Sequence, residues 1–449
     1  MEAAVAFLTL FLGLVSGPQI IDLTTTSDVA TVDLVLDEGP PVRLVGPPWT
    51  TRVDFGPDLQ PHELLAVARN ADGIELGRAR QLINAARPPA EVRVLVERDA
   101  NGRARSARWI GSAVSGAKPE IEMTFDGRGL GVDTDGRATL PPFDVATPHV
   151  LSALVSFGPT VSARHDLVLG GEINDQTRVE LTAVAFELPV ALGKGRALDL
   201  TEVEVLLDGQ PIRATAIDRG PAQVYVVRPS ELAEPALRRL GAHGRPPSKS
   251  ALGLSSGGFD GGDRSARRFA AGLERDDRVR MIWPQPTTAP GAALPTRLFH
   301  GSREFRGDGG GFFWLLANVQ GPRDSADAAP RFADAVAVAG LQALASGRRR
   351  AVVLLLDSTA ADPSFYGPAA VRRFLATLKV PLLVWSTLEQ PPLGAVWPGA
   401  TPIDSPRALE RAVGELREVL DRQRIVWVPG TLSPRRVTAG VVPRPSIRQ

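Results

Sequence analysis

The sequence predicts a multidomain chain in which all-β sandwiches come first and a doubly wound α/β domain follows. Between residues 19 and 220, short alternating strands are separated by Gly- and Pro-rich turns, at the spacing expected of small β-sandwiches. Between residues 331 and 387, helix, apolar strand, helix and apolar strand follow one another, as in a parallel sheet with right-handed crossovers. With 449 residues, the chain is too long for one core and suggests about two to four domains.

The first residues have the pattern of a signal peptide. An apolar run over residues 3–15 is followed by the small-residue exit Ser16-Gly17-Pro18, and the run is too short to span a membrane. We therefore predict a signal peptide over residues 1–17, export to the periplasm or the exterior, and no membrane insertion after its removal. Because the start contains Glu2 and no Lys or Arg, a buried strand is the alternative. The absence of cysteine excludes disulfides and thiolate chemistry.

Two β units follow, over residues 18–89 and 90–173. They share a local signature, since Pro61-His62 and Pro148-His149 each open an apolar strand after a proline-containing loop. Such a recurrence indicates tandem domains. One histidine at the same strand start of each unit is more simply a structural residue that bonds a loop than a metal ligand.

The rest of the chain divides into three segments. A β lead-in over residues 174–220 contains an Asp208-Gly209 hairpin turn, an α/β domain covers residues 221–430, and residues 431–449 are a loose tail or an edge strand. The α/β domain is expected to contain strands at residues 223–227, 279–283, 351–356, 381–385 and 424–428. Helices are expected at residues 231–240 and 264–276, over the periodic segment from residue 332, and after the helix starts at Pro368 and Ser405.

The charge balance disfavours nucleic acids and anionic membranes as partners. With 51 basic and 50 acidic residues, the net charge is only +1, so there is no electrostatic case for nucleic acid or for an anionic membrane surface. The short basic run at residues 348–350 is interpreted as a solvated turn.

Two family resemblances rest on quoted motifs. The strand pattern and the short hairpin turns Asp126-Gly127 and Asp135-Gly136 resemble the immunoglobulin-like modules of secreted bacterial proteins. The lead-in residues, the stretch RLFHGSREFRGDGGGFFWLL (residues 297–316) and the strand GRRRAVVLLLD resemble secreted von Willebrand factor A-like proteins of the acidobacterial type. The matching lead-in residues are Gly195, Arg196, Leu200, Thr201, Val205, Asp208 and Gly209. This second resemblance covers about residues 179–428 and implies a Rossmann-type α/β fold.

The von Willebrand A resemblance also implies a metal-ion-dependent adhesion site. In that family the first strand ends in Asp-x-Ser-x-Ser, and a later Thr and Asp complete a set of oxygen ligands for Mg²⁺. Here the first strand is followed by Arg228-Pro229-Ser230-Glu231, and a guanidinium in place of the first carboxylate would repel a cation. Asp357, with Ser358 and Thr359, stands in a matching place. We therefore predict a degenerate metal site without a cofactor, in which Arg228 pairs with Asp357.

The alternative for this site is a divalent cation held by Asp357 together with Asp260 or Asp263 of the Gly-rich loop. The function predicted from the sequence is that of an exported, non-enzymatic binding or scaffold protein with an unknown protein partner. The residues predicted to bind it lie at strand ends: Arg228, Ser230, Glu231, Asp357, Ser358 and Thr359. Metal-dependent adhesion through Asp357 is the alternative.

A serine hydrolase is a third possibility. Residues 253–257 match the nucleophile-elbow pattern around Ser255, and His300 is a downstream base. The flanking residues look like neither the strand nor the helix that this geometry requires. The scattered histidines also lack metal-binding spacing.

Overall fold

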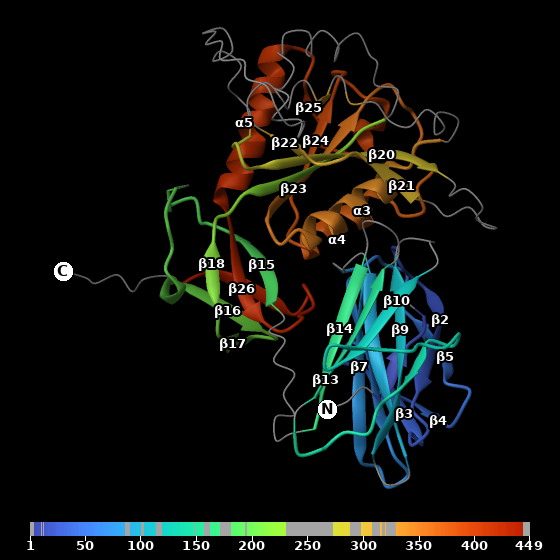
Figure 1. The fold of residues 1–449 in the computed structure, drawn as a ribbon. Coiled ribbons are helices and arrows are strands. Elements are labelled where there is room, and N and C mark those ends of the chain that lie inside the picture. Colours follow the sequence, from blue (N-terminus) through green and yellow to red (C-terminus); the bar gives the residue numbers. More distant parts are fainter. Residues whose placement is uncertain are drawn as a thin grey trace, which may run out of the picture. The chain divides into compact units, whose positions relative to one another are not determined.

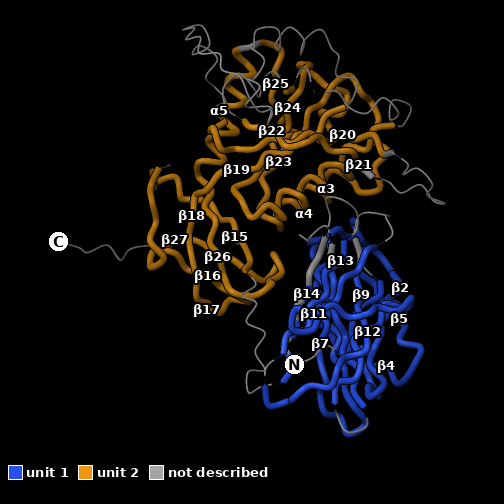
Figure 2. Tube along the Cα trace, viewed as in Figure 1, with its two compact units in different colours: residues 1–179 blue, residues 180–449 orange. Residues whose placement is uncertain are grey.

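A computed structural model gives the fold of the chain (Figure 1). It describes residues 4–9, 11, 13–85, 90–99, 103–113, 119–147, 149–156, 162–170, 181–193, 195–229, 273–287, 298–307, 315–316, 319 and 329–442. The chain divides into two compact units, residues 1–179 and 180–449 (Figure 2). Among the described residues, no helix has the length and apolar character needed to cross a bilayer.

The first unit begins with a two-sheet antiparallel sandwich. One sheet has the order β1-β2-β5 and the other has the order β4-β3-β6-β7. Apolar side chains of both sheets, such as Ile21 and Leu64, share one buried core. The strands are β1 (Val5–Phe7), β2 (Pro18–Thr25), β3 (Thr31–Leu36), β4 (Val42–Val45), β5 (Thr50–Asp54), β6 (His62–Arg69) and β7 (Glu75–Ile83).

The second sandwich repeats this topology strand for strand. Its sheets have the orders β12-β9-β8 and β11-β10-β13-β14, so β8 corresponds to β1 and β13 to β6. A tandem pair of seven-stranded, immunoglobulin-like sandwiches explains this pattern. The strands are β8 (Ala90–Arg98), β9 (Ala104–Ala113), β10 (Glu120–Phe125), β11 (Arg128–Leu130), β12 (Arg137–Thr139), β13 (His149–Ser156) and β14 (Ser162–Leu169).

The recurring histidine closes the same turn in both sandwiches. Nδ1 of His62 lies 2.9 Å from Oδ2 of Asp37, and Nδ1 of His149 lies 2.6 Å from Oδ2 of Asp126. Each aspartate also accepts a hydrogen bond from the main-chain N–H after the histidine. The hydrogen bond from His149 lowers the pKa of Asp126, and the same bond raises the pKa of His149. The histidines are therefore structural residues that bond a loop, as predicted.

The start of the first sandwich lies within the predicted signal peptide. Strand β1 pairs with β2, with Val5 opposite Thr25 and Phe7 opposite Leu23, and Val5 is fully buried. This arrangement matches the alternative of a buried strand and corrects the predicted start of the sandwich at residue 18. The reason is that β1 supplies the place that β8 occupies in the second repeat. Cleavage after residue 17 stays a prediction, and it would remove this strand.

The second unit contains a doubly wound sheet. The strands follow the order β21-β20-β19-β23-β24-β25, with β22 also paired to β20. Strands β19, β20, β23, β24 and β25 are parallel, whereas β21 and β22 run antiparallel to β20. The bounds are β19 (Ala222–Val227), β20 (Arg278–Thr287), β21 (Leu298–Gly301), β22 (Phe305–Arg306), β23 (Arg349–Leu356), β24 (Leu382–Ser386) and β25 (Thr401–Pro402).

Helices cover both faces of this sheet (Figure 1). Helix α5 (Pro406–Arg422) packs Leu409, Val413 and Leu416 on the face that carries Val353 and Leu355. Helices α3 (Phe332–Ala345) and α4 (Pro368–Thr377) lie on the other face. Ser405 caps α5 by accepting a hydrogen bond from Ala408 N, as the sequence predicted. The expected helix at residues 231–240 lies outside the described residues, as do residues 264–272 of the second expected helix. The described end of that second helix, residues 273–276, forms a bridge and a turn instead of a helix.

A small β module belongs to the same unit. Its sheets have the orders β15-β26-β18 and β17-β16-β27. The bounds are β15 (Leu181–Glu187), β16 (Val203–Leu207), β17 (Gln210–Ile212), β18 (Ala216–Asp218), β26 (Gln423–Pro429) and β27 (Val437–Val441), and short 3-10 helices η1 (Leu200–Glu202) and η4 (Pro392–Ala395) also occur in this unit.

The composition of this module corrects two predicted boundaries. Residues 424–428 were expected to be the last strand of the parallel sheet, but β26 pairs antiparallel with β15 and β18. The parallel sheet ends instead with β25. Part of the predicted tail, β27, pairs with β16, in agreement with the edge-strand alternative. The lead-in therefore needs the end of the chain to complete its core, in which Phe186 and Val205 pack against Val426 and Val437.

The basic run at residues 348–350 is not a solvated turn. Arg349 and Arg350 begin β23 and are 0% and 1% exposed. Arg349 donates to the main-chain oxygens of Gly220 and Leu420, and its Nη2 lies 3.5 Å from Oδ1 of Asp277. Burial lowers the pKa of Arg350 to about 10. These carbonyl and carboxylate partners make burial of the Arg349 guanidinium tolerable, and they cannot be recognised from the basic run alone.

Candidate functional site

Two of the predicted site residues, Arg228 and Asp357, follow strands at the point where the strand order of the parallel sheet reverses. Numbered along the chain, the six main strands have the order 3-2-1-4-5-6, so the switch point lies between β19 and β23. Val227 of β19 is the partner of Leu354 of β23, which brings the following residues, Arg228 and Asp357, to the same edge. In open α/β sheets this crevice at the carboxyl ends of the strands is where ligands bind.

Arg228 is a buried cation at this edge. It is 1% exposed, and it donates from Nη1 to the main-chain oxygen of Leu316 and from Nε, at 3.4 Å, to that of Pro229. Burial lowers the pKa of Arg228 to about 10. No ion pair joins it to Asp357 among the residues described, so the predicted Arg228–Asp357 pair is wrong. The guanidinium binds main-chain carbonyl groups instead.

Asp357 has a local role in the loop after β23. Its Oδ1 accepts a hydrogen bond of 2.9 Å from Thr359 N, and Ser358 is exposed. Ser230 and Glu231 lie outside the described residues, as do Asp260, Asp263 and Ser255, while His300 is exposed on β21. Within the described ranges, no group of three or more His, Asp and Glu side chains could hold a metal ion.

The loop over residues 357–367, which begins with Asp357, is hydrogen-bonded to the start of α3 through two carboxylates. Asp362 accepts from Phe332 N at 2.9 Å and from Ala333 N at 3.1 Å. In return, Asp334 of the first helical turn accepts from the N–H groups of residues 365 and 366, at 3.0 and 3.1 Å. The helix has no local side-chain cap at Arg331. Asp362 therefore takes the place of an N-cap residue, and the hydrogen bonds of Asp362 and Asp334 together hold the loop against α3.

This fastened loop presents an exposed aromatic side chain. Phe365 is 70% exposed, and its ring packs edge-on against Tyr366 with centroids 5.0 Å apart. Tyr366 itself is 8% exposed, so the exposed ring of Phe365 packs against a buried side chain. Phe365 was not among the binding residues predicted from the sequence, although it lies in the loop that begins with the predicted Asp357, Ser358 and Thr359. The strand-end surface comprises Asp357, Ser358, Thr359 and Phe365, because Arg228 is buried.

Comparisons with known proteins report only distant structural likeness. No protein-family model and no curated protein matches the chain. The fibronectin(III)-like modules of Clostridium thermocellum CbhA share 16% identity over 18% of this chain and 92% of theirs, with a TM-score of 0.16. The central fibronectin-III array of RIM-binding protein shares 11% identity over 38% and 73%, with a TM-score of 0.19.

A third similar structure is SGBP-B of the Bacteroides ovatus mixed-linkage glucan utilization locus, solved in complex with a mixed-linkage heptasaccharide. It shares 9% identity over 47% of this chain and 89% of its own, with a TM-score of 0.13. These scores carry no functional argument. The sandwich assignment rests on the repeated strand order of the first unit.

Proposed function

We propose that the chain is an exported, non-enzymatic binding or scaffold protein. Its α/β part acts as a von Willebrand A-like domain that binds a protein partner without a metal ion. The sheet order 3-2-1-4-5-6, with an antiparallel third strand, supports the doubly wound part of this proposal. The tandem sandwiches act as spacers or additional binding modules.

Phe365 carries the proposal. Exposed aromatic side chains at the centre of an interface often provide the largest share of binding energy. Because Asp334 and Asp362 already hold the loop in place, a partner would not have to order this loop on binding. Arg228 supports a metal-free mode, since it is a buried cation at the position where the resemblance implies the first carboxylate of the family motif.

Photo-cross-linking in the full chain tests the partner site. A benzoyl-phenylalanine at position 365 is expected to capture a partner from extracts of the source cells, whereas the same probe at Val190, which is 81% exposed, is not. With the purified partner, Phe365→Ala should weaken binding about thirtyfold, as expected for an interface anchor, and Val190→Ala should leave it unchanged. Equal affinities of the two variants would refute the proposed surface.

Calorimetric titration with Mg²⁺, Mn²⁺ and Ca²⁺ tests the metal-free mode. We expect no saturable heat from the wild-type chain. Binding that disappears in Asp357→Ala would overturn this part of the proposal and would favour metal-dependent adhesion through that carboxylate.

A further inference from the structure

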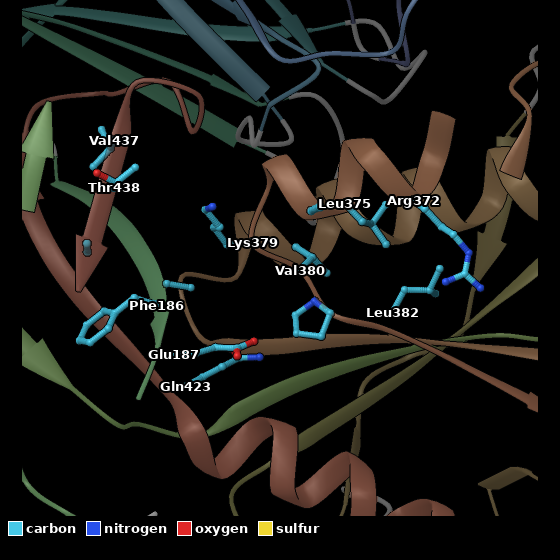
Figure 3. Close-up of a pocket in the computed structure, with 14 residues that line it drawn as sticks. Phe186, Glu187, Arg372, Leu375, Lys379, Val380, Leu382, Gln423, Val437 and Thr438 are labelled. Carbon is cyan, nitrogen blue, oxygen red and sulfur yellow. The ribbon is translucent and has the colours of Figure 1, made fainter. Parts of the chain in front are cut away.

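A cavity of the second unit lies away from the strand-end surface (Figure 3). Its volume is about 530 Å³, within the range of ordinary ligand pockets. It is lined by the end of α4 and the residues that lead into β24 on one side, and by β15 and β27 of the β module on the other. Because Pro381 precedes β24, the cavity lies at the amino end of that strand, whereas the strand-end surface lies at the carboxyl ends.

One wall of the cavity is the outer edge of a sheet. Strand β27 ends its sheet and pairs only with β16 among the described strands. Arg436 O accepts from Asp208 N, and Val442 N donates to Glu202 O, both at 2.9 Å. Because hydrogen-bonded and non-bonded positions alternate along an antiparallel pair, the even-numbered residues of β27 face β16. The N–H and C=O groups of Val437 and Ala439 therefore point away from it, and both residues line the cavity.

Strand β15 forms a second edge on the same cavity. It lies at the edge of its sheet, beside β26. The hydrogen bond from Leu188 N to Arg422 O, at 2.8 Å, shows that the even-numbered residues of β15 direct their N–H and C=O groups toward β26. The outward positions that line the cavity are Ala185 and Glu187. Among the outward positions, Ala185 of β15 and Val437 of β27 are buried, whereas Glu187 of β15 is exposed and Ala439 of β27 is half-buried. Each edge therefore has one buried and one accessible outward position beside the cavity.

The opposite wall combines apolar side chains with a free cation. Leu375, Val380 and Leu382 line it, and Lys379 follows the last turn of α4 with a φ of 55°. Figure 3 shows Lys379 across the cavity from Val437 and Thr438. Within the part of the chain that the structure describes, the Lys379 ammonium has neither a hydrogen-bond nor an ion-pair partner.

We propose that this cavity binds an extended peptide segment of a partner protein, which adds as a strand to the free edge of β27. The N–H and C=O groups of Val437 and Ala439 supply main-chain hydrogen bonds, and alternate side chains of the peptide enter the cavity. An aliphatic side chain packs on the wall of Leu375, Val380 and Leu382. An acidic side chain pairs with Lys379, which makes the preferred peptide apolar and acidic.

An array of acetylated pentapeptides tests this proposal on the full chain. The central residue is Asp in one half of the array and Lys in the other, and the flanking residues are drawn from Val, Ile, Thr and Ser. On the array, we expect the fluorescently labelled protein to bind Asp-centred peptides selectively. In solution, measured by the anisotropy of labelled peptides, the best Asp-centred peptides should bind with about tenfold higher affinity than their Lys counterparts. An array without selective binding would overturn the proposal.

Substitutions separate strand addition from other modes of binding. Ala439→Pro removes an outward N–H that the sheet does not use, and it should weaken the best peptide about tenfold. Val441→Pro changes the same edge outside the cavity lining and should keep the affinity within about threefold. Lys379→Glu tests the charge without altering the strand, and it should abolish the preference for Asp.

Three other outcomes would contradict the assignment. Wild-type affinity in both Ala439→Pro and Lys379→Glu would exclude this cavity. A loss confined to Ala185→Pro would place the peptide on β15 instead. Binding that appears only in a chain shortened after residue 442 would identify the chain's own last residues as the occupant.

Discussion

Removal of the Asp362 carboxylate tests how the loop over residues 357–367 is held against α3. In Asp362→Ala, the N–H groups of Phe332 and Ala333 lose their acceptor, and both residues are fully buried. An unsatisfied buried N–H costs about 1–3 kcal/mol, and loss of a helix cap with its negative charge falls in the same range. We therefore expect a loss of about 3 kcal/mol in the free energy of unfolding of the second unit.

Differential scanning calorimetry of the full chain measures this loss. For a domain of this size, 1 kcal/mol shifts the unfolding midpoint by about 2–4 °C, so Asp362→Ala should lower the midpoint of the second unit by roughly 6–12 °C. Asp357→Ala is the matched control, because Asp357 accepts one main-chain hydrogen bond in the same loop. A midpoint for Asp362→Ala equal to that of the control would refute the capping role.

Three further changes test other parts of the fold. Gln423 is buried and bonds both the N–H and the C=O of Arg350, at 2.8 and 2.9 Å, so Gln423→Leu should cost about 2–4 kcal/mol in urea unfolding; a loss below about 1 kcal/mol would contradict this. The pair of His149 and Asp126 has a raised histidine pKa and a lowered carboxyl pKa. Its stabilisation is therefore full between about pH 4 and 6.5, is lost as the pH rises through the folded pKa of His149, and is lost as the pH falls through that of Asp126. The difference in unfolding midpoint between wild type and His149→Gln should peak near pH 5, and a difference that is constant from pH 3 to 9 would argue against the pair. Gly136 has a φ of +75°, and a Cβ there would lie 2.4 Å from an indole nitrogen, so Gly136→Ala should cost about 1–2 kcal/mol in urea unfolding of the first unit; unchanged stability would refute this.

Local pattern predicted the central α/β elements well. The uniform apolar run that became β23 lies between two helices, and this combination fits few structures other than a buried parallel strand. The hairpin turns at residues 126–127 and 208–209 were also predictable, since Asp126 and Asp208 adopt positive φ before a glycine.

Strand partners could not be predicted in the same way. The sequence of β26 was interpreted as a buried parallel strand. Apolar residues alone do not indicate whether a strand pairs parallel or antiparallel. The same limit applies to Val5 and Phe7. A short apolar run near the start of a chain has the same composition whether it belongs to a signal peptide or to a core strand. Arg349 was misjudged because its compensating carboxylate, Asp277, is distant in sequence.

The role of Arg228 depends on the same kind of distant partner. A guanidinium that is 1% exposed can remain there only if carbonyl or carboxylate oxygens surround it, and the oxygen of Leu316 lies 88 residues further along the chain. A guanidinium fixed in this way at the end of β19 is held by main-chain oxygens, and it offers no open coordination position to a partner. In the proposed metal-free mode, binding at this edge would depend on shape and apolar area, which Phe365 on the adjoining loop would supply. Substitution of Phe365 should then weaken binding, whereas addition of divalent cations should not strengthen it.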